Sequence, residues 1–157
     1  MQKNFYKNIK GKRILITGNT GFVGGYLSLT LNLLGAKILG YSLKMKNQNF
    51  LSNNIKYKNK VKMIEDDILN INKYTKKIKQ FKPQIIIHLA SQPLVKEAYL
   101  NTLRTYNTNI LGTVNLLEVC KKLKNVEHVV IFTSDKVYEN LNGSILKKIE
   151  IRWYRSL

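Results

Sequence analysis

The sequence has little of several residue types that disulfide-rich or metal-binding proteins need. Its 157 residues include one cysteine, Cys120, which excludes an internal disulfide framework and a cysteine-based zinc site. Two histidines, His88 and His128, leave little for a histidine-rich metal site, so no metal is expected. No apolar run approaches the ~20 residues of a membrane helix, and the N-terminus lacks the apolar stretch of a signal peptide. These absences predict a cytoplasmic chain with no membrane segment.

Acidic residues are also scarce, with 9 Asp and Glu against 27 Lys and Arg and a formal net charge of +18. Such a balance favours nucleic acid as a partner, because Lys and Arg neutralise phosphates. However, 23 of the 27 cations are Lys, and Lys, Asn and Ile, which have A- and T-rich codons, are all abundant. Biased codon usage therefore explains the charge, and a basic nucleic-acid-binding module stays a less favoured alternative.

Hydrophobic residues make up 44% of the chain, enough for a buried core, and they fall into alternating strand and helix patterns. Short apolar runs predict strands at 13–17, 36–41, 61–65, 84–89 and 126–132. Helices are predicted at 22–34, 71–81 and 94–124, the last with Ile110, Val114, Leu117 and Leu123 near one face. Residues 43–60 are predicted to form a loop, with a short helix within it as the alternative. This order predicts an α/β fold with a Rossmann-like, doubly wound parallel sheet of about five strands.

A glycine-rich turn, Thr17-Gly18-Asn19-Thr20-Gly21-Phe22-Val23-Gly24, follows the first predicted strand and opens the first helix. In that context Gly18 permits a tight turn, Gly21 lets backbone N–H groups approach a pyrophosphate, and Gly24 lets the helix lie close to the sheet. The helix N-terminus adds partial positive charge. The pattern predicts dinucleotide binding, with a plain turn between strand and helix as the alternative.

The Gly-x-x-Gly-x-x-Gly spacing resembles the extended short-chain dehydrogenase/reductases. Later segments fit the same resemblance: Asp67-Ile68 after the third strand, His88-Leu89-Ala90 after the fourth, and Asn109 within Asn-x-x-Gly-Thr. A helix cap is a second, compatible role for Asp67. The resemblance implies that the cofactor is held by Gly18, Asn19, Thr20, Gly21, Phe22, Val23, Ser42, Asp67, Ile68, Leu89, Ala90, Ser91 and Asn109.

Within that superfamily, residues 9–140 resemble the CDP-glucose 4,6-dehydratases, most specifically at Ser134-Asp135-Lys136. The resemblance implies conversion of CDP-glucose to its 4-keto-6-deoxy form for deoxysugar and surface polysaccharide synthesis, in homo-oligomeric enzymes. Asp135 would be the acid, Lys136 the base, and Thr133 and Ser134 would hydrogen-bond the C4 oxygen. The alternative for Asp135 and Lys136 is an exposed ion pair at a strand end.

The cofactor choice is open from the residues alone. Ser42, and no carboxylate, ends the second predicted strand, and the nearby Lys44 and Lys46 leave NADP open. The resembled family has the same Gly-Tyr-Ser-Leu segment and uses NAD. The resemblance therefore implies NAD.

The family's catalytic Tyr-x-x-x-Lys pair is missing from its place after the fifth predicted strand. Tyr6 and Lys10 have that spacing but precede the first strand. We expect 1–141 to be the N-terminal part of an NAD-binding Rossmann domain, and 142–157 to be a tail outside the family pattern. One synonymous codon choice for 152–157, read one base later, gives Gly-Gly-Ile-Asp-Pro, and its last two bases followed by the T of a stop codon give Tyr. A frameshift between about 142 and 152 is therefore our hypothesis.

Such a chain would have an incomplete sheet and no substrate domain. We therefore expect an NAD-binding fragment that is inactive as a dehydratase by itself. A regulatory protein that binds a dinucleotide and catalyses nothing is the alternative.

Overall fold

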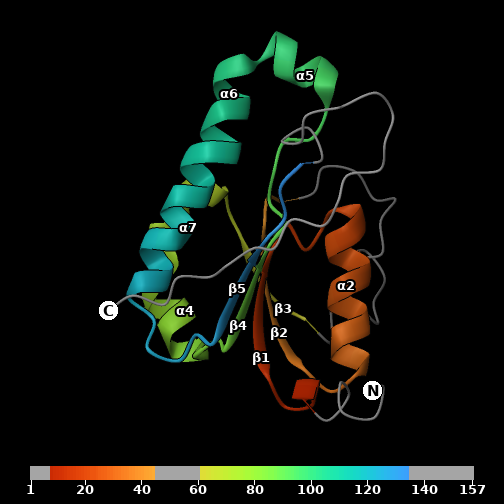
Figure 1. Ribbon diagram of the computed structural model, residues 1–157, viewed down its shortest axis with the longest axis vertical. Helices are drawn as coiled ribbons and strands as arrows, with labels where there is room; N and C mark the ends of the chain where they lie inside the picture. Colours follow the sequence, from red (N-terminus) through yellow and green to blue (C-terminus); the bar gives the residue numbers. More distant parts are fainter. Residues whose placement is uncertain (1–7, 45–60, 135–157) are drawn as a thin grey trace, which may run out of the picture.

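Five parallel strands form one sheet in the computed structural model, which describes residues 8–44 and 61–134 (Figure 1). The strands are β1 (Arg13–Thr17), β2 (Lys37–Ser42), β3 (Lys62–Glu65), β4 (Ile85–His88) and β5 (His128–Ile131), in the order β3-β2-β1-β4-β5. The chain therefore starts in the middle of the sheet, builds outward to β3, and then crosses to β4 and β5. The predicted α/β, Rossmann-like doubly wound sheet is confirmed for these residues.

Helices cover both faces of the sheet, as Figure 1 shows. One face carries α2 (Phe22–Leu33). The other carries a 3-10 helix η2 (Ile68–Tyr74), α4 (Thr75–Phe81) and α7 (Gly112–Lys121). Three further elements, α5 (Val95–Leu100), α6 (Thr102–Tyr106) and a π-helical turn η3 (Asn107–Leu111), precede α7, and α5 and α6 have no buried residue and extend past the carboxyl ends of the strands (Figure 1). No helix in the described ranges is long and apolar enough to cross a membrane.

The alternation of side chains along β1 supplies both halves of the core. Leu15 packs with Tyr41, Ile86 and Leu116 beneath η2, α4 and α7, whereas Ile14 and Ile16 pack on the face that α2 covers. Such strands are buried on both faces, so they read as continuous apolar runs. This makes β1 and β2 visible in the sequence, whereas the edge strands β3 and β5 are partly exposed. All five predicted strands agree with the structure to within a few residues.

The helix faces differ from the simplest amphipathic interpretation. In α7 the buried side chains are Leu116 and Val119, while Ile110, Val114 and Leu117 are at least 38% exposed. Ile110, Val114 and Leu117 therefore lie on the outer face, whereas Leu123, expected on the same face, packs against the core. The helix predicted over 94–124 is also interrupted at Asn101, whose φ of −132° is not helical.

The α2 helix turns small side chains toward the sheet. Its buried residues are Gly24, Gly25, Ser28 and Leu31, and Phe22 and Val23 are exposed. Gly35, at φ +89°, ends the helix as expected, because the left-handed conformation suits glycine. Small residues on the inner face allow this helix to approach the strands closely.

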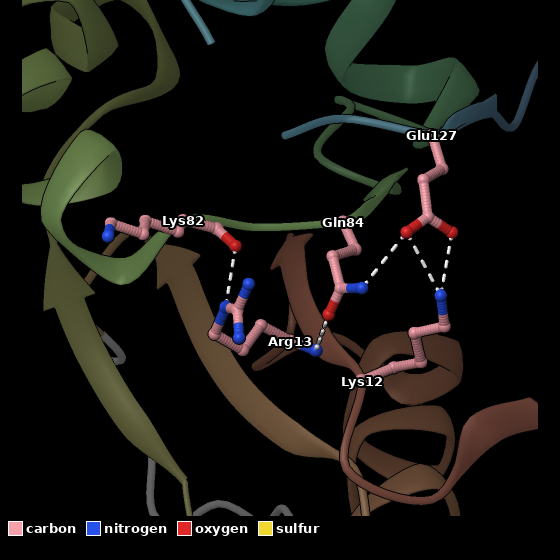
Figure 2. Close-up of polar contacts among 5 residues, drawn as sticks. All are labelled: Lys12, Arg13, Lys82, Gln84 and Glu127. Atoms are coloured by element: carbon pink, nitrogen blue, oxygen red, sulfur yellow. Dashed lines mark hydrogen bonds and ion pairs between the residues drawn. The ribbon is translucent and has the colours of Figure 1, made fainter. Parts of the chain in front are cut away.

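A polar cluster ties the starting ends of β1, β4 and β5 together (Figure 2). Lys12 Nζ donates to Glu127 Oε2 at 2.7 Å, and Gln84 Nε2 donates to Glu127 Oε1 at 2.9 Å. Arg13 Nε donates to the Lys82 carbonyl oxygen at 2.7 Å. This cluster lies at the end of the sheet opposite the carboxyl ends of the strands. It therefore stabilises the scaffold without being part of the site described next.

Several sequence predictions fall outside the described residues. These are most of the 43–60 loop, the Asp135-Lys136 pair, and the tail at 142–157.

Candidate functional site

The turn between β1 and α2 is pressed against its neighbours so closely that two glycines are required. Gly18 has φ +68°, and a Cβ there would lie 2.7 Å from backbone atoms of Leu89 and Ala90. A Cβ on Gly24 would lie 2.2 Å from the Gly18 carbonyl oxygen. The Gly18 N–H donates to the Tyr41 carbonyl oxygen at 2.8 Å, which joins the turn to β2. The predicted tight turn and close helix approach are therefore both present.

The N-terminus of α2 opens beside this turn. Gly21 precedes the helix, no side chain caps it, and no acidic residue lies in its first turn. The first N–H groups of a helix have no acceptor within the helix and carry partial positive charge. This end of α2 therefore offers donors to an anion.

A crevice of about 480 Å³ opens over the turn, at the carboxyl ends of the strands. It lies where the chain order reverses between β1 and β4, the place where open α/β sheets bind ligands. Most of the expected cofactor residues line it: Gly18, Thr20, Gly21, Phe22, Val23, Ser42, Asp67, Ile68, Leu89, Ala90 and Ser91. Segments distant in the sequence thus meet in one cavity.

The two remaining expected residues, Asn19 and Asn109, do not line the crevice. Asn19 is fully buried, and its Oδ1 accepts a hydrogen bond from the Ser42 hydroxyl at 2.8 Å. The Ser42 oxygen in turn accepts from the Thr20 N–H at 3.2 Å, so this hydroxyl holds the glycine turn in place. A Cβ on Gly40 would lie within 2.6 Å of three Asn19 side-chain atoms. Gly40 was missed from the sequence, although a glycine inside a strand signals close approach.

Two adjacent aspartates form the acidic wall of the crevice. Asp67 accepts a hydrogen bond from the Leu69 N–H at 3.0 Å, so its helix-cap role is present alongside its place in the lining. Hydrogen bonds from Asn70, and then from Tyr74, lower the pKa of Asp66. Both carboxylates therefore have structural partners in η2.

No lysine or arginine lines the crevice in the described ranges, although the chain carries 27 of them. The charged lining residues are Asp66 and Asp67. The lysines and arginines of residues 8–44 and 61–134 thus lie outside the lining of this cavity.

The expected catalytic residues follow β5. Thr133 lines the crevice beside Phe132, whereas Ser134 is described but is not part of the lining. Asp135 and Lys136 lie outside the described residues. The sequence reasoning missed Phe132, Pro93 and Thr108 as lining residues, because apolar and small polar residues in loops carry no motif.

Cys120 has no features of a reactive nucleophile. It lies in α7 and packs against the core, and burial raises the pKa of its thiol to about 11. In the part of the chain that the structure describes, no group of three or more His, Cys, Asp or Glu is arranged to hold a metal ion.

The strand order, the glycine turn and the crevice at the switch point together define a nucleotide-binding Rossmann domain. Comparison with known families makes this more specific. The model of the GDP-mannose 4,6 dehydratase family matches residues 15–147, and the chain belongs to that family.

Curated relatives agree with this assignment. The CDP-glucose 4,6-dehydratase of Salmonella typhimurium is 41% identical over 140 residues, which are 89% of this chain and 38% of that protein. UDP-glucuronate 4-epimerase 6 of Arabidopsis thaliana is 35% identical over 147 residues, 87% of this chain and 31% of that protein. The chain therefore spans less than two fifths of the length of these relatives.

Solved structures share the fold. The epimerase Mth375 of Methanothermobacter thermautotrophicus matches with a TM-score of 0.77 at 24% identity, over 90% of this chain and 41% of that one. MoeE5, solved in complex with UDP-glucose and NAD, matches with a TM-score of 0.68 at 25% identity, over 85% of this chain and 40% of that one.

Proposed function

We propose that this chain is the NAD-binding part of a CDP-glucose 4,6-dehydratase, with residues 1–141 contributing to the Rossmann domain. The glycine turn under the crevice carries the proposal, because Gly18 and Gly24 leave no room for side chains and α2 begins beside them. The 41% identity to the Salmonella typhimurium dehydratase supports the choice of substrate.

The residues of the crevice fit a dinucleotide. The diphosphate would meet the N-terminus of α2, and the adenine would lie near Asp67 and Ile68. NADP would bring a 2′-phosphate dianion into a cavity with two aspartates and, among the described residues, no cation. We therefore favour NAD, which when bound accepts a hydride from the sugar and returns it.

The residues after β5 would handle the sugar. Thr133 and Ser134 would donate hydrogen bonds to the C4 oxygen, Asp135 would protonate the departing C6 hydroxyl, and Lys136 would accept the C5 proton. The position of Thr133 in the crevice lining supports this assignment. A reaction on a nucleotide sugar with NAD suits a cytoplasmic location, which we also propose.

Calorimetric titration with NAD⁺ and NADP⁺ tests the cofactor proposal. We expect NAD⁺ to bind at least about tenfold more tightly, a difference of roughly 1.4 kcal/mol. Equal or tighter binding of NADP⁺ would contradict the choice of NAD. A cooperatively melting sample that binds neither would contradict the site itself.

The expected inactivity of this chain is tested with CDP-glucose. Incubation with CDP-glucose and NAD⁺ should give no 4-keto-6-deoxy sugar, because no Tyr-x-x-x-Lys pair follows β5 in this sequence. Formation of that product would contradict the expectation that the chain is inactive as a dehydratase by itself.

A further inference from the structure

A buried histidine at the end of β4 connects the crevice wall to the helices behind it. His88 is 2% exposed. Its Nδ1 lies 2.6 Å from Thr17 Oγ1 on β1, and its Nε2 lies 3.0 Å from Thr113 Oγ1 on α7. The histidine thus bridges the first strand and the last described helix.

The hydrogen bonds around this histidine have one possible direction. Thr17 Oγ1 accepts from the Ala90 N–H at 3.2 Å and also from the Leu89 N–H at 3.2 Å, which is shared with the Thr17 carbonyl oxygen, so its single proton is left for His88 Nδ1. Thr113 Oγ1 donates to the Asn109 carbonyl oxygen at 2.7 Å, so it accepts the proton of His88 Nε2. Both partners therefore require the neutral imidazole with its proton on Nε2.

The hydrogen bonds continue from Thr113 through Asn109 to Gln92, at the end of the segment 89–92. Asn109, in the π-helical turn, accepts from the Gln92 N–H through Oδ1 at 2.7 Å and donates to the Gln92 carbonyl through Nδ2 at 3.2 Å. The segment 89–92 is thus held at its start by Thr17 and at its end by Asn109. Leu89, Ala90 and Ser91, between these ties, line the crevice.

We propose that neutral His88 is a positioning residue for the dinucleotide crevice, because it joins the two ties that hold residues 89–92 against the cofactor. This inference rests on the proposed NAD-binding function. His88 does not line the crevice itself, so it acts through Thr17 and Thr113.

The surroundings of His88 support a neutral ring. Within the described ranges, β1 presents Thr17, α7 presents Thr113, and β5 places Ile131 opposite His88 in register. Burial lowers the pKa of His88 to about 4, and no charged group contributes to the shift. A protonated ring would need an acceptor at Nδ1, where Thr17 Oγ1 already accepts two N–H groups.

The test compares three variants of the whole chain. His88→Leu removes both hydrogen bonds, and NAD⁺ should bind roughly tenfold more weakly. His88→Gln keeps one donor and one acceptor, and its affinity for NAD⁺ should be within about threefold of that of the unchanged chain. Thr113→Val removes the acceptor of His88 Nε2 and the bond to the Asn109 carbonyl oxygen but leaves the bond to Thr17, and should give an intermediate loss of NAD⁺ affinity.

A matched control is available on α6. Thr102 Oγ1 donates to the Ala98 carbonyl oxygen four residues earlier, the same bond that Thr113 makes to Asn109, but it contacts no histidine. Thr102→Val should leave NAD⁺ affinity unchanged. If Thr102→Val and Thr113→Val weaken binding equally, the relay has no special role and the proposal fails.

Two readouts do not need the cofactor. Nitrogen-15 NMR of the unchanged chain should show His88 protonated at Nε2 and not at Nδ1 between pH 5.5 and 8, and the other tautomer would overturn the proposal. Amide exchange at 89–92 should accelerate in Thr113→Val and not in Thr102→Val, and equal exchange would also overturn it. If the unchanged chain binds no NAD⁺, the proposed function fails, and these two readouts still decide whether His88 positions the wall. They also decide it if His88→Leu does not fold.

Discussion

Replacing Gly24 with alanine should distinguish the effect of helix propensity from the effect of close packing at the glycine turn. In an ordinary helix, Gly→Ala stabilises by up to about 1 kcal/mol. Here the new Cβ would lie 2.2 Å from the Gly18 carbonyl oxygen and 2.8 Å from the Asn19 Cα. Both are backbone atoms, so no side-chain rotation relieves the overlap, and the first turn of α2 must shift.

Overpacking of this kind costs about 1–3 kcal/mol, which outweighs the gain in helix propensity. If the strain falls on the glycine turn, NAD⁺ affinity should drop roughly 5- to 150-fold, since each 1.4 kcal/mol is a factor of ten. Titration calorimetry on Gly24→Ala, with a thermal melt to confirm folding, measures both quantities.

Gly21→Ala is the matched comparison. Gly21 has φ −70° and ψ 172°, an extended conformation that alanine adopts, and its Cβ would lie 3.3 Å from the Gly18 carbonyl oxygen. We expect a smaller loss of affinity than for Gly24→Ala. Unchanged NAD⁺ binding and a raised melting temperature in Gly24→Ala would refute the argument that close approach at this turn builds the site.

Three further predictions concern stability. The pKa of His88 in the folded chain, about 4, lies below the ordinary 6.5, so the unfolded chain binds more protons between these pH values. The free energy of unfolding should therefore fall by about 2 kcal/mol from pH 7.5 to pH 5. Urea unfolding of His88→Gln should show a flatter pH dependence than that of the unchanged chain. Gly112→Ala should destabilise by about 1–3 kcal/mol, because a Cβ there would lie 2.6 Å from Ile68 Cγ2; a raised melting temperature would contradict this packing. Glu127→Gln should lower the melting temperature slightly, and 1 M NaCl should shrink the difference from the unchanged chain, because its ion pair with Lys12 is partly exposed; a salt-independent difference would count against the pair.

Much of the scaffold follows from local patterns in the sequence. In the run Ile85-Ile86-Ile87 the middle residue is buried and its two neighbours pack, partly buried, against the other half of the core, so the strand character of the run is visible without tertiary information. The glycine turn was also visible, because Gly18 and Gly24 stand between a strand and a helix at a spacing that backbone geometry requires.

The helices over 94–124 show where local patterns fail. An apolar residue every three or four positions predicts an amphipathic helix but does not say which stripe faces the sheet. Leu116 and Val119 are buried and Val114 and Leu117 are exposed, because Gly112 lets this side of α7 contact Ile68 in η2. The interruption at Asn101 was likewise invisible in the composition of the segment.

The sequence by itself determined the order of strands and helices, the glycine turn and the residues offered to a dinucleotide, because these depend on neighbours along the chain. Only the tertiary structure decided what those residues do for one another. Ser42 bonds to Asn19 and holds the turn, and His88 joins Thr17 to Thr113. These partners are 23, 71 and 25 positions apart in the sequence, and the pairing of β1 with its neighbours and the packing of α7 on the sheet bring them within hydrogen-bonding distance.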